Sequence, residues 1–176
     1  REMLCELFHL IDPFQIIFTS NATDSLNLAI QGSVSPGNHV ILTSMEHNAV
    51  VRPLKEMEKL GLNLTIVPCA PDGSIDPDDI SRAVQPATRL IVTTHASNVT
   101  GTILPIETIG KIARSHGVPY LVDAAQTAGV LPIDLSKLPV DMMAFPGHKG
   151  LLGPQGTGGL YIHPNINLRA IRQGGT

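Results

Sequence analysis

"TRLIVTTHASNVTGTILPIETIGKIARSHGVPYLVDAA", residues 88–125, contains the clearest indication of the fold class. Its two ends, residues 88–95 and 119–125, are apolar runs of the kind found in strands buried on both faces. Between them, residues 105–117 carry the apolar spacing of a helix. A strand, a helix and a second strand in this order predict two parallel strands connected by a helix.

The same alternation continues on both sides of this stretch, after an amphipathic helix that starts at the first residues. We predict strands at 15–20, 39–44, 62–69, 141–145 and 158–163, and helices at 22–34, 48–61 and 76–84. This order predicts an α/β fold, a three-layer α/β/α arrangement with a mostly parallel sheet. In such folds ligands bind just beyond the carboxyl ends of the strands.

Composition narrows the function classes. The 176 residues are 43% apolar and 15% charged, with a net charge of −3, which suits one globular domain. No basic block, no Trp and only two Tyr leave little for nucleic-acid binding by stacking, and no apolar run approaches a membrane span. We therefore expect neither a nucleic-acid nor a membrane partner. Cys5 and Cys69 are isolated, so we expect buried, unreactive thiols and a reduced, cytoplasmic protein.

Polar residues follow five of the predicted strands. They are Ser20, Asn21, Thr23, Asp24, Glu46, His47, Asn48, Ser97, Asn98, Thr100, Asp123, Gln126, His148 and Lys149. Taken singly, each has a simpler explanation as a helix cap, a turn residue or a solvated lysine. Because the carboxyl ends of parallel strands share one edge of a sheet, we expect the side chains to converge on one site.

Two interpretations stay open at this point. Residues 20–24 open a helix, so they form either an N-cap or a phosphate site, because free N–H groups and the helix dipole favour an anion. His47, His95, Asp123 and His148 suggest a metal site, although no metal-binding spacing supports one.

The glycine-rich stretch at 145–159, FPGHKGLLGPQGTGG, presents a single lysine, Lys149. It matches neither a P-loop nor a dinucleotide-binding turn. We expect its glycines to let the backbone bend closely around a bound ligand and around the strand that follows.

Six motifs carry a resemblance that covers essentially the whole chain. They are NATDSLN, TSMEHNAVV, THASNVTGTILPI, LVDAAQTAG, GHKGLLGPQG and the terminal GGT. In this order and spacing they resemble the fold-type I pyridoxal-phosphate enzymes, specifically the class V aminotransferase family that includes the cysteine desulfurases. The resemblance implies pyridoxal 5'-phosphate as cofactor and residues 1–176 as the cofactor-binding large domain, without the family's N-terminal arm and C-terminal small domain.

The resemblance also implies three catalytic residues. Lys149 would form the Schiff base with the cofactor aldehyde, and Asp123 would keep the pyridine nitrogen protonated. His47 would stack on the ring and handle protons. Further cofactor contacts are implied for Ala22, Thr23, Asn98, Gln126, Gly147, His148 and Thr176, the last of these reaching the phosphate of a neighbouring subunit in a homodimer.

The implied activity is release of sulfur from L-cysteine to give alanine, with a sulfur-acceptor protein as a possible partner. The alternatives are another class V aminotransferase, a selenocysteine lyase, or an incomplete fragment that only binds a partner. Neither Cys5 nor Cys69 lies where the family's nucleophilic cysteine belongs. Pro146 stands where the family usually has Ser or Thr, and it lacks the hydroxyl and N–H that would contact phosphate. We therefore expect weaker retention of the cofactor.

Overall fold

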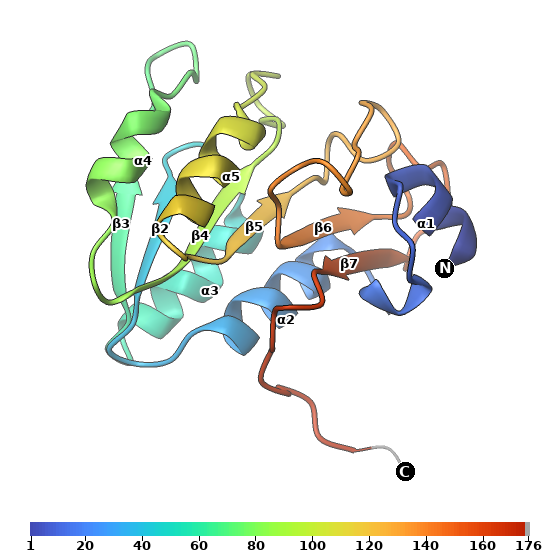
Figure 1. Cartoon of the computed structure of the whole chain (residues 1–176), viewed down its shortest axis with the longest axis horizontal. Helices are drawn as coiled ribbons and strands as arrows, with labels where there is room; N and C mark the ends of the chain where they lie inside the picture. Colours follow the sequence, from blue (N-terminus) through green and yellow to red (C-terminus); the bar gives the residue numbers. More distant parts are fainter. Residues whose placement is uncertain (175–176) are drawn as a thin grey trace.

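A seven-stranded sheet lies between two layers of helices in the computed structural model, which describes residues 1–174 (Figure 1). The helices are α1 (Glu2–Phe8), α2 (Ala22–Ser33), α3 (Asn48–Glu58), α4 (Pro77–Ala83) and α5 (Ile106–Ser115), with a short 3-10 turn at Pro13–Gln15. The strands are β1 (Ile16–Thr19), β2 (His39–Thr43), β3 (Asn63–Val67), β4 (Thr88–Thr94), β5 (Tyr120–Asp123), β6 (Met142–Pro146) and β7 (Gly158–Ile162). The predicted fold class is confirmed, and each predicted element is present.

The strand order places five strand ends at one edge of the sheet. The order is β1-β7-β6-β5-β4-β2-β3, and β7 pairs antiparallel with both of its neighbours. All other pairs are parallel, so among the described residues β7 alone runs against the rest. The segments that follow β1, β2, β4, β5 and β6 therefore leave the sheet on the same side.

Alternating residues of each central strand belong to two separate hydrophobic cores, one on each face of the sheet. Residues such as Ile91, Tyr120 and Val122 pack against α1, α4 and α5 on one face. Their neighbours Val92 and Leu121 pack with α2 and α3 on the other face. Successive side chains of a strand point to opposite faces, so strands buried on both faces need the unbroken apolar runs seen in the sequence.

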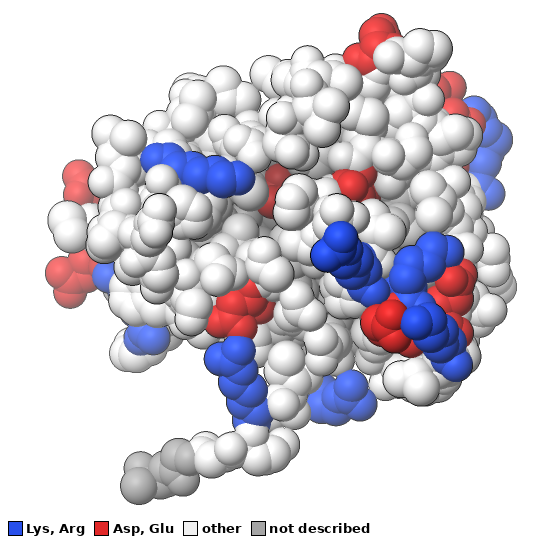
Figure 2. Space-filling view, turned by 180° about the vertical axis from the view of Figure 1, so that it is seen from behind, with Lys and Arg blue, Asp and Glu red and all other residues white. Residues whose placement is uncertain are grey.

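Charged side chains of both signs are distributed over the surface, as the small net charge of −3 leads one to expect. Figure 2 shows basic and acidic side chains scattered over the visible face, several of them side by side. Within residues 1–174 no helix is long and apolar enough to cross a membrane. Cys5 is buried as predicted, but the prediction for Cys69 was wrong, because this residue follows the edge strand β3 and is only half-buried.

Candidate functional site

A cavity of about 150 Å³ opens at the edge of the sheet where the five strands end. Eight of the ten residues predicted to bind a cofactor line it: Ala22, Thr23, His47, Asn98, Asp123, Gln126, His148 and Lys149. Gly147 lies between the lining residues Pro146 and His148, and Thr176 lies outside the described residues. Of the fourteen polar residues expected to converge, eight line this cavity, and the six that do not are Ser20, Asp24, Glu46, Asn48, Ser97 and Thr100.

The N-terminus of α2 forms one wall of the cavity. Asn21 is the N-cap, and its Oδ1 accepts a hydrogen bond from Asp24 N at 2.8 Å. The first N–H bonded within the helix is that of Ser25, which donates to Asn21 O at 3.1 Å, so the N–H groups of Ala22 and Thr23 have no intrahelical acceptor and remain available to a ligand. The two interpretations of this segment are thus compatible, because the cap occupies one donor and leaves two for an anion.

Close packing against β7 fixes this helix end. A Cβ atom at position 158 would lie 2.7 Å from both Cα and C of Asn21, so the helix start rests directly on bare backbone. Ser25 Oγ, one turn into the helix, donates to Gly159 O at 2.9 Å. The glycine pair at the start of β7 therefore sets the position of the two free N–H groups.

His47 serves as the N-cap of α3 and also lines the cavity. Its Nδ1 accepts from Ala49 N at 3.0 Å. A ring nitrogen that accepts a hydrogen bond carries no proton, so in the neutral ring the proton lies on Nε2. The cap interpretation is correct, and it leaves Nε2 free to act on a ligand.

Asp123 is the last residue of β5 and is 3% exposed. Its Oδ1 accepts from Ala125 N at 2.9 Å. Burial raises the pKa of this carboxyl, and the hydrogen bond from Ala125 and the charges of His47 and Lys149 oppose the rise. A positively charged ligand nitrogen would favour the ionised form further.

Lys149 lies in a tightly folded loop between β6 and β7. The loop is held by hydrogen bonds from Gly147 N to Thr157 O at 2.8 Å and from Gly153 N to Gly147 O at 2.7 Å. A Cβ atom at position 147 would lie 2.2 Å from Thr157 Oγ1. The glycine two residues before Lys149 therefore lets the backbone pack closely on Thr157, the residue before β7, and its contact with a ligand stays a prediction. Lys149 itself is exposed and borders the cavity.

Sequence analysis missed part of the lining. Leu26, Ala49, Thr94, Ala96 and Ala125 line the cavity without having been singled out from the sequence, whereas Asn21 and Pro146, which also line it, were named there. Strand alternation could have identified Thr94, because it follows Leu90 and Val92 on the face that carries α2 and α3. Pro146 ends β6 beyond Ala144, the last residue that pairs with β5, so its missing N–H disturbs no pairing there.

The residues suggested for a metal site do not come together. His95 is buried, but it does not line the cavity that holds His47, Asp123 and His148. Across residues 1–174, no group of three or more His, Cys, Asp or Glu side chains is arranged to hold a metal ion.

The donor set instead suits a small anionic ligand with a carbonyl group and a basic nitrogen. The free N–H groups of α2 favour a phosphate, as does the imidazole of His148. Lys149 supplies a primary amine, and Asp123 supplies a buried carboxyl that a ring nitrogen would stabilise.

Known proteins resemble the chain over this whole architecture. The family model described as "Aminotransferase class-V" matches residues 1–176. The cysteine desulfurase IscS of Mannheimia succiniciproducens is 44% identical over 170 residues, which cover 93% of this chain and 42% of that protein. The chain thus spans less than half the length of this curated relative.

Two solved structures have closely similar folds. The structure of SspA in complex with cysteine matches with a TM-score of 0.92 and 34% identity, over 99% of this chain and 51% of that one. A mutant of C-DES with glycine covalently linked to the PLP cofactor matches with a TM-score of 0.86 and 34% identity, over 93% of this chain and 44% of that one.

Proposed function

Since the chain belongs to the class V aminotransferase family, we propose that its cavity binds pyridoxal 5'-phosphate and that the whole protein releases sulfur from L-cysteine. One observation carries the proposal. The amine of Lys149, the carboxyl of Asp123, the ring of His47 and the N-terminus of α2 all border one small cavity. The similarity to cysteine desulfurase IscS and to SspA with bound cysteine supports the choice of substrate.

The residues that line the cavity then have distinct roles in holding the cofactor. When bound, the cofactor supplies an aldehyde that captures amines and a ring that withdraws electrons from them. Lys149 is the amine that holds the cofactor in place between turnovers, and Asp123 holds a proton on the ring nitrogen by its negative charge. The N–H groups of Ala22 and Thr23, together with His148, bind the phosphate.

The remaining lining residues orient the ring and handle protons. His47 faces the cavity with its proton on Nε2, because Nδ1 is occupied by the α3 cap. It is therefore suited to stack on the ring and to exchange a proton there. Asn98 and Gln126 carry amide groups that can hydrogen-bond the ring hydroxyl.

Three further parts of the proposal concern the assembled protein. We propose a homodimer, on the resemblance of Thr176 to the family threonine that reaches a neighbouring subunit. A sulfur-acceptor protein and a cytoplasmic location remain predictions from the sequence.

The cofactor assignment is tested by chemical trapping. The protein is mixed with pyridoxal phosphate and reduced with borohydride, and the adduct is mapped by peptide mass spectrometry. We expect one adduct, on Lys149, which Lys149→Ala abolishes. Lys111→Ala is the matched control, because Lys111 is exposed and pairs with Glu107 on α5, and it should label like the unaltered protein. Labelling spread over Lys55, Lys59 and Lys111 would contradict a specific site.

The reaction is tested on the full-length protein with L-cysteine and a thiol reductant. Equal amounts of alanine and sulfide support desulfuration. Transfer of the amino group without sulfide would favour another class V reaction. Binding of the cofactor without turnover would favour a role in partner binding alone.

A further inference from the structure

Glu46 places a second buried carboxyl group beside the cavity. It follows β2, and its Oε1 accepts hydrogen bonds from Thr43 Oγ1 at 2.6 Å and from Thr94 N at 3.0 Å. Its Oε2 is buried and has no hydrogen-bond partner among the described residues. A buried carboxylate oxygen without a partner is costly, whereas the neutral acid removes most of that cost.

The hydrogen bond from Thr94 N joins Glu46 to β4, the strand that pairs with β5 and its last residue Asp123. Thr94, which donates to Glu46, is the register partner of Asp123 on the neighbouring strand. Glu46 follows β2 and Asp123 ends β5, and β4 lies between these two strands, so the two groups stand on either side of Thr94 at the same edge of the sheet. The charge of Asp123 acts on Glu46 and raises its pKa, so ionisation of both groups is unfavourable.

The surroundings decide which of the two groups keeps its proton. Asp123 borders the cavity, and the hydrogen bond from Ala125 N and the charge of Lys149 favour its ionised form. The charged group that acts on Glu46 is Asp123 itself, and burial together with this repulsion raises the pKa of Glu46 to about 8. Tyr120 is the other titratable group facing it; the phenol stays neutral because burial raises its pKa, and its hydroxyl bonds Thr93.

We propose that Glu46 is a positioning residue that carries a proton in the working protein and so leaves the single negative charge of the pair on Asp123. Its purpose rests on the proposed function, since an ionised Asp123 is needed to hold a proton on the cofactor ring. The protonation itself does not depend on a bound cofactor. Glu46 also fixes the end of β4 through Thr94, next to the lining residue Ala96.

Because the pKa of Glu46 is raised in the folded chain, the stability of the fold depends on pH. An ordinary Glu in the unfolded chain has a pKa of about 4.3, whereas in the folded chain Glu46 has one of about 8. Between these values the folded state binds the extra proton, so stability is highest at the acid end and falls as pH rises toward 8. Glu46→Gln keeps the shape of the neutral acid and removes the titration.

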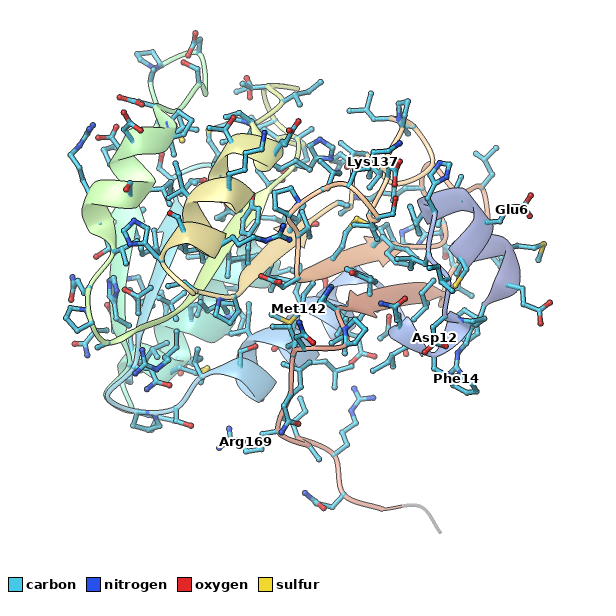
Figure 3. All side chains as sticks on the ribbon, in the orientation of Figure 1. Glu6, Asp12, Phe14, Lys137, Met142 and Arg169 are labelled. Carbon is cyan, nitrogen blue, oxygen red and sulfur yellow. The ribbon has the colours of Figure 1, made fainter. Side chains whose placement is uncertain are left out.

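The experiment compares the unaltered full chain, Glu46→Gln and the control Glu6→Gln, all without cofactor. Figure 3 shows Glu6 on α1 with its side chain directed away from the molecule. Infrared difference spectra at pH 7 should show a protonated carboxyl band that Glu46→Gln alone removes. The midpoint of denaturant unfolding should fall from pH 5 to pH 8 less steeply in Glu46→Gln than in the other two proteins.

Two results would overturn the inference. One is a spectrum in which Glu46→Gln removes an ionised carboxylate band, and the other is an unchanged pH dependence of unfolding. Should Glu46→Gln not fold, Thr43→Val replaces it: loss of the hydroxyl that stabilises the carboxylate should move the transition to higher pH, and an unmoved transition would refute the proposal. Because these readouts need no cofactor, their failure is distinct from a failure of Lys149 labelling.

Discussion

The contact between Gly158 and Asn21 makes the position of the α2 N-terminus sensitive to a single methyl group. In Gly158→Ala, the new Cβ would lie 2.7 Å from Cα and C of Asn21 and 3.0 Å from its N. These are backbone atoms, so no side-chain rotation relieves the overlap. Gly158 itself lies between its register partners Thr19 on β1 and Pro146 on β6, which limits movement of β7. The helix start must therefore move away from the sheet.

The expected cost follows from this overlap. Overpacking of a well-packed interior costs about 1–3 kcal/mol, and each kcal/mol lowers Tm by about 2–4 °C in a chain of this size. Displacement of the N–H groups of Ala22 and Thr23 should also weaken phosphate binding. Loss of one hydrogen bond to a charged group is worth about 1.5–3 kcal/mol, which corresponds to a decrease in cofactor affinity of about tenfold or more.

Gly110→Ala is the matched control. A Cβ atom at position 110 would lie 2.3 Å from Pro139 O, a more severe backbone contact, but α5 packs on the face away from α2 and α3. We expect both variants to lose stability in thermal unfolding, and only Gly158→Ala to lose affinity in a pyridoxal-phosphate titration followed by absorbance. Equal affinity in the two variants would refute the argument that β7 positions a phosphate site at α2.

Two further substitutions change other residues that line the cavity, one at the start of α2 and one at the end of β6. Asn21→Ala removes the cap whose Oδ1 accepts from Asp24 N, so we expect a loss of about 1 kcal/mol in the free energy of unfolding, measured with denaturant. A stability equal to that of the unaltered protein would show that the cap contributes nothing. Pro146→Ser restores a hydroxyl beside His148 and should lower the Kd for pyridoxal phosphate, determined by titration. An unchanged Kd would mean that the hydroxyl makes no contact with the phosphate.

Most of the fold could be predicted because local pattern and burial agree in this chain. The runs at β2, β4, β5 and β6 are buried along almost their whole length, and a central strand covered on both faces needs this composition. The convergence of Asp123, His47 and Lys149 followed from one rule, that parallel strands end at the same edge.

Other features depend on contacts between distant parts of the chain. The antiparallel direction of β7 and its place between β1 and β6 leave no trace in the local alternation of residues. Glu46 appeared in sequence only as one more polar residue after a strand, and the enclosure of its carboxyl group depends on Thr94 of the distant strand β4, whose N–H donates to it. Cys69 was misjudged for the same reason, since only the strand order shows that β3 is an edge strand.

The place of β7 in the sheet also sets an order of events during synthesis. β1 is among the first segments to be made, yet its only strand neighbour within the described residues is β7, nearly the whole chain later. The start of α2 rests on the same late strand through Gly158 and Gly159. Contacts so distant in sequence form slowly, because the entropy cost of closing a long loop comes before the contacts stabilise the chain. A growing chain can thus assemble β2 to β5 early, but it has no anion-binding wall until the glycine pair of β7 arrives.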